Sequence, residues 1–456
     1  MVFSSSIFVF CFLPVLIFLY YLAKDKYSNI ILLFFSLVFY AWGEPVYVLL
    51  MLLSIVVNYT LGFLIAKQWK YKKLFLWIAV AYNIGILFIF KYLNFSVGVI
   101  NRFLGANIVI SKIALPIGIS FYTFQIMSYV IDLYRGKIEL QKNLLHLALY
   151  VSLFPQLIAG PIVRYSDVQA QICGRYVDIN TFYIGLKRFA IGFSKKILIA
   201  DQLSPLVDSA FANYYPSIYG HWIGIIAYSL QIFFDFSGYS DMAIGLGKLF
   251  GFDFNENFDH PYISCSITEF WRRWHISLGS WFRDYLYIPL GGNRKGTYRT
   301  YINLLIVFLC TGFWHGASFN FIAWGLYYAV FLILEKAFAD KTLNKLPSAV
   351  QHIYSVVVIL FGWVLFRADN LTSAVQYIKH MFVASGADWA NVLMDVNSKR
   401  LLIIAAGIFI SIPHKKLAGR ISRYQFVSDI FVIVVFLLAL CYMVGSGFSP
   451  FLYFRF

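Results

Sequence analysis

Apolar segments follow one another along almost the whole chain of 456 residues, and short polar turns separate them. A helix needs about 20 apolar residues to cross the hydrocarbon core of a bilayer. Segments near that length predict helices at 7–23, 28–43, 45–66, 74–93, 114–131, 144–163, 182–200, 221–250, 300–316, 318–338, 353–367, 401–413 and 427–446. Because several are short or amphipathic, we expect about 11 true crossings, with the others tilted, re-entrant or interfacial.

Composition supports this pattern. The chain is 61% hydrophobic and only 13% charged, which is far too apolar for a soluble protein of this size. We therefore expect an all-α polytopic membrane protein. No linker, repeat or low-complexity tract separates a second folding unit, so one membrane-embedded domain over 1–456 is predicted. The five cysteines lack the paired spacing of a disulfide framework or a metal site, and we expect neither.

The charge distribution predicts an orientation. Lysine and arginine total 37 against 21 acids, an excess that in a membrane protein reports cytoplasmic loops rather than nucleic-acid binding. Lys24 and Lys26 follow the first predicted span, and four lysines follow the third within 67–73, so the amino terminus is expected outside. A second basic cluster predicts a cytoplasmic face and consists of Arg272, Arg273, Arg283, Arg294, Lys295 and Arg299.

The segment 268–285 has the periodicity of one helix. Glu269 stands four residues before Arg273, the favourable order for an ion pair, and His275 falls on an aromatic face. Arg272 and Arg283 fall on an adjacent face. Such a helix can lie at the membrane surface and hold an anionic ligand. The alternative is a structural interfacial helix whose arginines contact lipid phosphates, and the pattern leaves both open.

His315 follows the apolar run 304–309 and stands within predicted membrane. Ionisable residues at that depth are costly and usually functional, and burial favours a neutral imidazole that can accept a proton. Gly312 and Gly316 would allow a substrate or another backbone to approach closely. The alternative is a buried histidine that is satisfied by a carbonyl group.

Three acids accompany these histidines. Asp235 and Asp241 lie within an apolar run of helical length and either orient an imidazole or pair with an arginine, and we favour the structural pairing. Asp201 either interacts with the Lys195 and Lys196 pair or lies at a helix end facing the site. A buried histidine base without a metal, a serine elbow or a phosphate loop suits acyl transfer, in which a hydroxyl group attacks a thioester.

Several motifs together resemble the membrane-bound O-acyltransferase family, in particular its bacterial branch for exported polysaccharides. They are PQLIAGPIVRY at 155–165, FFDFSGYSDMAIGLG at 233–247, HPYISCSITEFWRRWHISLGSWFRDYLYIPLGGNR at 260–294, TGFWHGASFNFIAWG at 311–325, LFRADNLTSA at 365–374 and PFLYFRF at 450–456. The resemblance implies a fold of about 11 membrane helices, with re-entrant and interfacial helices around a central tunnel.

The resemblance also implies roles for individual residues. It makes His315 the essential histidine, His275 the second characteristic histidine on the cytoplasmic side of the tunnel, and Asp201 a functionally important acid. Arg272, Arg273 and Arg283 are expected to bind the acyl donor. We expect acetyl-CoA as that donor, with no permanently bound cofactor.

The expected partners follow from the same branch. They are a polysaccharide acceptor such as alginate or peptidoglycan, an exported acetyltransferase that finishes the transfer, and membrane lipid. The expected location is the bacterial inner membrane. Two other functions stay open at this point, which are transfer of D-alanine from a carrier protein to teichoic acid and transport or flipping without acyl chemistry. A purely structural subunit would leave both histidines unexplained.

Overall fold

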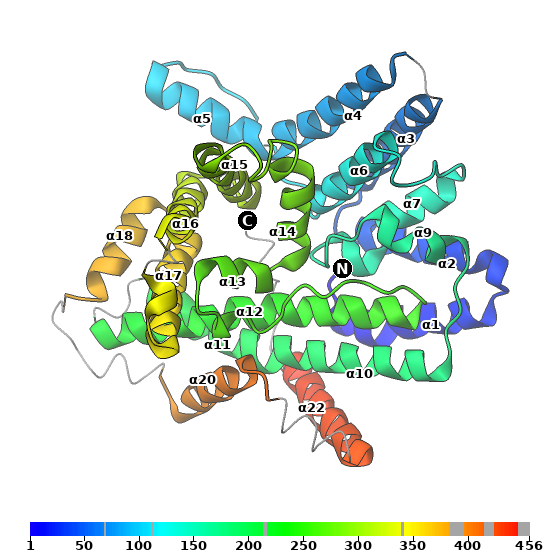
Figure 1. Ribbon diagram of the computed structural model, residues 1–456. Helices are drawn as coiled ribbons and strands as arrows, with labels where there is room; N and C mark the ends of the chain where they lie inside the picture. The colour runs from blue at the N-terminus through cyan, green and yellow to red at the C-terminus, as the bar shows by residue number, and fades with distance from the viewer. Residues whose placement is uncertain are drawn as a thin grey trace. The chain divides into compact units, whose positions relative to one another are not determined.

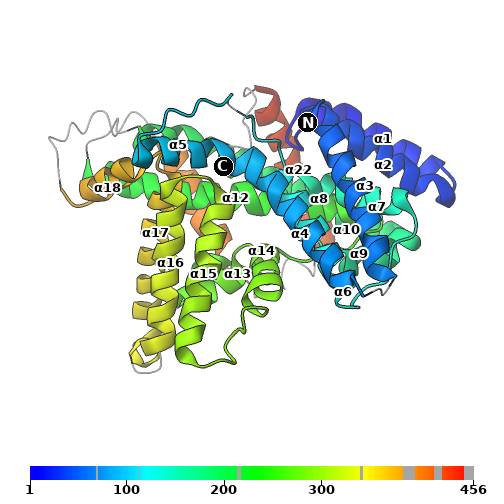
Figure 2. The ribbon, with the colours of Figure 1, turned by 90° about the horizontal axis from the view of Figure 1, so that it is seen from above.

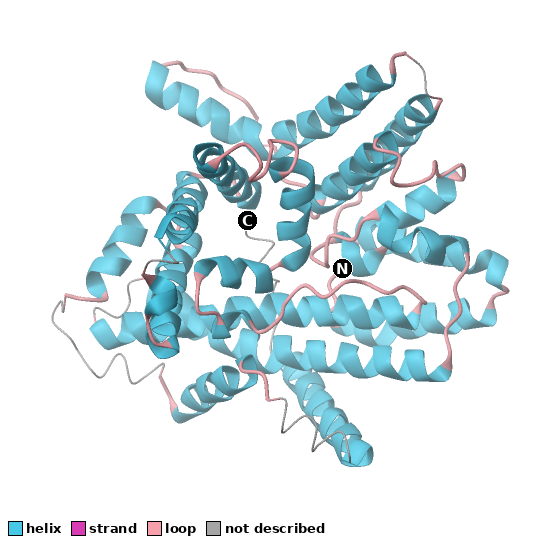
Figure 3. Ribbon diagram, in the orientation of Figure 1, coloured by secondary structure: helices cyan, strands magenta, loops and turns pink. Residues whose placement is uncertain are grey.

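All regular secondary structure among the described residues is helical, and no strand occurs among them (Figure 3). The computed structural model describes residues 1–67, 70–111, 113–212, 217–338, 342–383, 396–414 and 424–445. The motif at 450–456 lies outside these ranges. The described chain forms two compact units, of which the first comprises 1–189 and 239–255 and the second 190–238 and 256–456. Two of the three unit boundaries fall within α10 (Ile179–Lys195) and α12 (Ile218–Leu249), and the third lies in the loop after α12.

The first unit contains the amino-terminal helices. Its elements are η1 (Phe8–Phe12), α1 (Leu13–Leu22), α2 (Asp25–Ala41), α3 (Tyr47–Ala66), α4 (Lys72–Leu87), η2 (Phe88–Tyr92), α5 (Leu93–Leu104), α6 (Ile119–Tyr134), α7 (Leu144–Ser152), α8 (Phe154–Leu157), α9 (Tyr165–Cys173), most of α10 and the end of α12. The rings of Phe8, Phe12, Phe39 and Phe154 pack together in its core. Asn58 on α3 and Asn83 on α4 are both buried and donate amide hydrogen bonds to each other, which satisfies two polar groups between apolar helices.

The second unit contains both candidate histidines. Its elements are η3 (Lys196–Ala200), α11 (Asp201–Phe211), the first part of α12, η4 (Pro261–Ile263), α13 (Ile267–Arg273), α14 (Ile276–Phe282), η5 (Arg283–Tyr287), α15 (Thr297–His315), α16 (Phe319–Phe338), η6 (Leu343–Lys345), α17 (Ser348–Arg367), α18 (Leu371–His380), α20 (Ser398–Ser411) and α22 (Gln425–Gly445). Figure 1 labels most of these helices along the chain.

Five described segments are long and apolar enough to cross a membrane. They are Tyr47–Ala66, Lys72–Leu104, Phe319–Phe338, Ser348–Arg367 and Gln425–Gly445, and Phe8–Leu22 is a shorter apolar helix. The segment expected at 74–93 is therefore part of a helical stretch that continues to Leu104. The count of about 11 crossings stays a prediction.

The helix expected at 144–163 is interrupted, contrary to the sequence pattern. α7 ends at Ser152, Leu153 leaves the helical conformation, and the short α8 begins at Phe154. Pro155 explains the break, because its ring would collide with the carbonyl group four residues earlier and it has no N–H to donate. The chain therefore turns before the motif that follows it.

The helix expected over 268–285 is also interrupted. α13 ends at Arg273, and His275 has a left-handed backbone with φ of 46° before α14 begins at Ile276. Trp271, His275 and Leu278 therefore do not share one continuous helical face. The interruption has a local cause, because the backbone of residues 257–259 takes the hydrogen bonds that a continuous helix would make. Asp259 N–H donates to the carbonyl of Arg273, and Ile276 N–H donates to the carbonyl of Asn257.

Glycines let α15 and α16 approach closely, and this contact positions His315 at the end of α15. A Cβ atom on Gly312 would collide with the carbonyl oxygen of Phe321, and one on Gly325 would collide with that of Phe308. The partner that approaches Gly312 is thus another backbone, which is one of the two alternatives expected from the sequence. Figure 2 shows α15, α16 and α17 side by side in the second unit.

Candidate active site

A cavity of about 480 Å³ lies in the second unit among α13, α14, η5, α15 and α16. This volume is within the range of small-molecule sites. Its wall combines apolar and aromatic groups with a few polar ones, as ligand sites commonly do. The lining residues are Thr268, Trp271, Arg272, Trp274, His275, Ile276, Leu278, Gly279, Ser280, Phe282, Arg283, Leu304, Val307, Phe308, Thr311 and Leu332.

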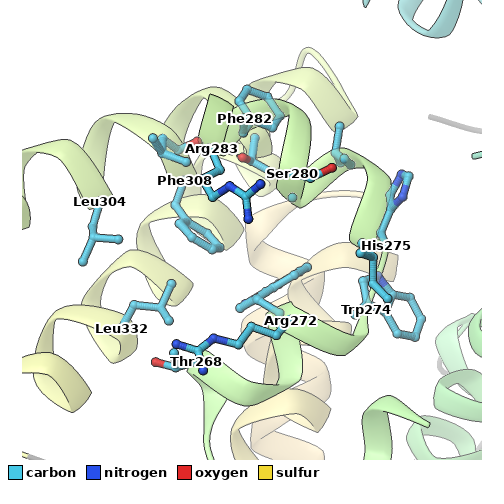
Figure 4. A pocket seen from close by; sticks show the side chains of 16 residues that line it. Thr268, Arg272, Trp274, His275, Ser280, Phe282, Arg283, Leu304, Phe308 and Leu332 are labelled. Carbon is cyan, nitrogen blue, oxygen red and sulfur yellow. Dashed lines mark hydrogen bonds between the residues drawn. The ribbon is translucent and has the colours of Figure 1, made fainter. Parts of the chain in front are cut away.

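Two arginines make the lining of the cavity positive. Figure 4 shows Arg283 in the upper part of the view and Arg272 in the lower part, and they come from η5 and α13. Within the described part of the chain, Arg272 has no carboxylate within ion-pair distance, whereas Arg283 lies 2.8 Å from Asp284. Guanidinium groups bind phosphate and carboxylate oxygens through paired hydrogen bonds, so the cavity suits a ligand with an anionic group.

Arg273 is not among the residues that line the cavity, unlike Arg272 and Arg283. Its guanidinium lies 3.0 Å from Glu269 and 2.8 Å from Asp259. The ion pair with Glu269 agrees with the spacing in the sequence, and the contact with Asp259 ties α13 to the preceding loop. Binding of the donor by Arg273 stays a prediction, and its observed contacts are those of a residue that holds α13 in place.

Asn257 organises the backbone and side chain around His275. Its side-chain oxygen is 3.1 Å from His275 Nδ1 and 3.1 Å from the backbone nitrogen of Ser277, and it accepts the Ser277 hydroxyl at 2.8 Å. Asn257 is fully buried. Because the Ser277 N–H belongs to the first turn of α14, the same oxygen caps this helix and holds the histidine that begins it.

The ring of His275 is in apolar surroundings. Its centroid is 4.6 Å from that of Phe236 and 6.2 Å from that of Trp314, and the residue is only 2% exposed. Burial lowers the pKa of His275 from 6.5 to about 3, because an imidazolium ion loses its hydration there. The imidazole is therefore neutral at physiological pH. Figure 4 shows the ring pointing away from Arg272 and Arg283.

His315 ends α15 and is enclosed by aromatic rings. Its ring centroid is 5.1 Å from those of Trp314, Trp324 and Phe366, and the residue is 6% exposed. His315 is not among the residues that line the cavity, but Thr311, one helical turn earlier on the same face, is. The cavity thus extends to within about a turn of His315.

Aromatic side chains lie between the cavity and His315 along two routes. Trp314 lies next to both histidines, with ring centroids 6.2 Å from His275 and 5.1 Å from His315. On the second route, Trp271 lines the cavity and lies 5.4 Å from Trp324, which is 5.1 Å from His315. The two histidines are therefore neighbours of the same tryptophan.

Glu335 of α16 fixes the start of α13. Its carboxylate accepts hydrogen bonds from the backbone nitrogens of Ile267 at 2.6 Å and Thr268 at 2.8 Å, and from the Thr268 hydroxyl at 2.6 Å. Tyr354 on α17 donates a further bond to it at 3.3 Å. A negative charge at a helix N-terminus is favourable, so this buried acid is well satisfied and aligns α13 with α16.

The acids expected near the site have lysine or arginine partners. Lys196 Nζ lies 2.6 Å from Asp201 and 2.7 Å from Asp235 in the second unit. Asp201 therefore contacts Lys196 of the lysine pair, the first of the two alternatives raised by its sequence position, and it stands where η3 continues directly into α11. The partner of Asp235 is likewise a lysine and not the expected arginine. In the first unit, Asp241 pairs with Arg188 at 2.8 Å. The catalytic role of Asp201 stays a prediction.

Among the described residues, no group of three or more histidines, cysteines and acids is placed to hold a metal ion. The sequence-based reasoning missed Asn257 and Glu335. Asn257 stands in the polar stretch NENFDHPY, where an asparagine is a common helix-capping residue, and this was the only signal available for it. Glu335 could have been noticed as a single acid near the end of an apolar helix.

Comparison with known proteins agrees with the motifs. A probable alginate O-acetylase of Pseudomonas aeruginosa is 44% identical over 417 residues, which cover 90% of this chain and 79% of the relative. A peptidoglycan O-acetyltransferase of Helicobacter pylori is 35% identical over 85% of this chain and 80% of the relative. A teichoic acid D-alanyltransferase of Bacillus subtilis is 31% identical over 55% of this chain and 67% of the relative.

The sequence profile of the membrane-bound O-acyltransferase family matches residues 34–372, a range that includes the cavity, both histidines and the Lys196 cluster. The match confirms the resemblance seen in the motifs and the expected all-α, polytopic fold class. The chain belongs to the membrane-bound O-acyltransferase family and is an O-acyltransferase.

Proposed function

We propose that this protein takes an acetyl group from a cytoplasmic thioester, acetyl-CoA, and passes it on for O-acetylation of an extracytoplasmic polysaccharide. The observation that carries the proposal is a cavity lined by Arg272, Arg283 and His275, next to His315, with Trp314 packed against both histidines. Relatives that are named for O-acetylation of alginate and of peptidoglycan support the choice of an acetyl group and a polysaccharide.

The donor occupies the cavity with its charged end at the arginines. Arg272 and Arg283 bind phosphate oxygens of the nucleotide, and the apolar wall of Leu304, Phe308 and Leu332 packs against the arm that carries the thioester. Arg272 is exposed and has no carboxylate partner among the described residues, so it can bind an anion without first breaking an ion pair.

In the transfer step, His315 acts as the base. It takes the proton from an acceptor hydroxyl group, the hydroxyl oxygen forms a bond to the thioester carbonyl carbon, and the C–S bond breaks as the thiolate of CoA leaves and regains a proton. The aromatic side chains around His315 separate it from the cavity, so Trp314 or Trp324 must move when the donor binds. Asp201 contributes to the transfer step indirectly, through its contact with Lys196.

The remaining assignments follow from the direction of transfer. The basic cluster that includes Arg272 and Arg283 faces the cytoplasm, where acetyl-CoA is available, and the amino terminus lies outside. The protein is located in the bacterial inner membrane. An exported acetyltransferase partner completes the transfer to the polymer, as is expected for this branch of the family.

The variant His315→Ala tests the proposal. Purified protein should lose acetyl-CoA-dependent transfer and hydrolysis while its thermal unfolding in detergent stays cooperative, because only the base is removed. His414→Ala, at a histidine beyond the end of α20, is the matched control and should keep wild-type rates. A wild-type rate in His315→Ala would refute the proposed chemistry.

Transfer of D-alanine from an acidic carrier protein is a second candidate. It is favoured by the exposed basic cluster and by the similarity to a teichoic acid D-alanyltransferase. Incubation with radiolabelled acetyl-CoA in one sample and a radiolabelled D-alanyl carrier in another distinguishes the donors. Label taken up only from the carrier would contradict the acetyl-CoA proposal.

A further inference from the structure

The side-chain oxygen of Asn257 determines which nitrogen of His275 carries the hydrogen. A backbone N–H can only donate, so the Asn257 atom that receives the Ser277 N–H at 3.1 Å is the carbonyl oxygen and not the amide nitrogen. This oxygen has no hydrogen to give. His275 Nδ1, which lies 3.1 Å from it, must therefore be the donor.

A neutral imidazole carries one hydrogen, so a donor at Nδ1 leaves Nε2 as a bare acceptor. Nε2 is buried and has no hydrogen-bond partner among the described residues. Nε2 therefore keeps its capacity to accept a hydrogen bond from a donor that enters beside it. The ring is thus arranged to receive a hydrogen bond.

The surroundings of the ring also favour the neutral form. The groups packed against it are aromatic, namely Phe236 from α12, Phe258 from the preceding loop and Trp314 from α15. The charged side chains of the adjoining cavity are Arg272 and Arg283, and both are positive. An imidazolium ion would gain no opposite charge from any of these five residues.

We propose that Asn257 is a positioning residue that holds His275 as the neutral Nδ1–H tautomer, so that Nε2 accepts a hydrogen bond from an N–H or O–H group of the bound substrate. The substrate part of this inference rests on the proposed acyl transfer, whereas the tautomer part does not. His275 then accepts a hydrogen bond from the substrate and does not bind phosphate. Arg272 and Arg283 bind the phosphate.

The tautomer is measured without turnover. Protein labelled with 15N-histidine contains eight histidines, and the His275→Gln variant identifies the signals of His275. At pH 7 the spectrum should show a protonated Nδ1 and an unprotonated Nε2 for this residue. A protonated Nε2 or a charged ring would overturn the proposal whether or not the protein transfers acetyl groups.

Substitutions at Asn257 test whether it acts through His275. Asn257→Asp keeps an acceptor oxygen for Nδ1 and adds a negative charge, so His275 should keep its tautomer and become charged at a higher pH than in the wild type. Asn257→Leu removes the acceptor and should lower acetyl-CoA hydrolysis about tenfold or more, as a wrong tautomer does. Ser277→Ala removes only one of the three bonds to the same oxygen and is the matched control, with a rate near that of the wild type.

The double variants decide between a positioning role and a merely structural one. In the His275→Gln background, Asn257→Leu should cause no further loss of hydrolysis, and Asn257→Asp should no longer alter the pH profile. Losses that multiply in His275→Gln/Asn257→Leu would overturn the positioning role. If Asn257→Leu does not fold, Asn257→Asp still tests the proposal. A titration of His275 in Asn257→Asp that equals that of the wild type would also contradict the positioning role.

Discussion

Lys196 Nζ lies 2.7 Å from Asp235 Oδ1, and both side chains are only 3% exposed. The same ammonium group lies 2.6 Å from Asp201 Oδ1. Two carboxylates and one ammonium group are thus joined inside the second unit, where α12 meets η3 and the start of α11. A buried charge is costly unless it is paired, so this lysine stabilises both acids and they stabilise it.

Lys196→Met should destabilise the protein strongly, by about 3–5 kcal/mol, because it removes the ammonium group from the buried Asp235 and from the partly buried Asp201. Adding Asn at the second position, in Lys196→Met/Asp235→Asn, should restore part of that loss. Thermal unfolding in detergent measures both effects. Lys195→Met, at the preceding and less buried lysine, serves as the control, and an equal loss in both single variants would argue against the ion cluster.

Arg272→Gln and Arg283→Gln should each raise KM for acetyl-CoA by about tenfold or more, since hydrogen bonds to charged groups contribute roughly 1.5–3 kcal/mol. The effect should decrease as ionic strength rises, because these side chains are exposed. Steady-state kinetics at two salt concentrations provide the measurement. Arg273→Gln, which loses contacts with Glu269 and Asp259, should instead lower stability, and a matching rise in KM there would show that the assignment to two arginines is incomplete.

Stability should fall in acid partly because of His275. Its pKa is near 6.5 in an unfolded chain and is lowered to about 3 by burial in the folded protein. Between these values the unfolded state binds a proton that the folded state does not, so the contribution of His275 to stability is complete above pH 6.5 and is lost as the pH falls toward 3.

Unfolding temperatures of the wild type and of His275→Gln between pH 7.5 and 5 provide the comparison. The wild type should lose stability more steeply below pH 6.5, by up to about tenfold in the unfolding equilibrium per pH unit. Parallel curves for the two proteins would mean that His275 already titrates normally in the folded state.

Glu335→Ala should loosen α13 and weaken donor binding, because Thr268, Trp271 and Arg272 of the cavity wall lie on this helix. The lost hydrogen bonds leave buried N–H groups unpaired, at a cost of about 1–3 kcal/mol each in the absence of water. The expected result is a lower unfolding temperature together with a higher KM for acetyl-CoA. Lys336→Ala, at the adjacent exposed position, should change neither.

The sequence predicted the helical class and the positions of most long helices, because an apolar run of about 20 residues forms few structures other than a membrane helix. α3, α16 and α17 begin within five residues of the expected positions and end at the expected residues. The sequence also singled out Arg272, His275 and Arg283, and all three line one cavity. Local periodicity was sufficient for these features.

The sequence could not reveal features that depend on distant partners. The segment 268–285 has the periodicity of one helix, yet Asn257 and Asp259 compete for its backbone and interrupt it at His275. The pairing of Glu335 with the start of α13 joins residues far apart in the chain. Pro155 was a readable local signal, and the break between α7 and α8 follows from it.

The link between Glu335 and α13 has a consequence for the order of synthesis. Ile267, whose N–H binds Glu335, is made 68 residues before that acid. When α13 emerges from the ribosome, Ser266 can cap Glu269 but the N–H groups of Ile267 and Thr268 still lack their acceptor, and the start of the helix is completed only after α16 has been translated and inserted beside it. The cavity wall is thus assembled late, and a chain that stops short of residue 335 carries both histidines without a finished cavity beside them.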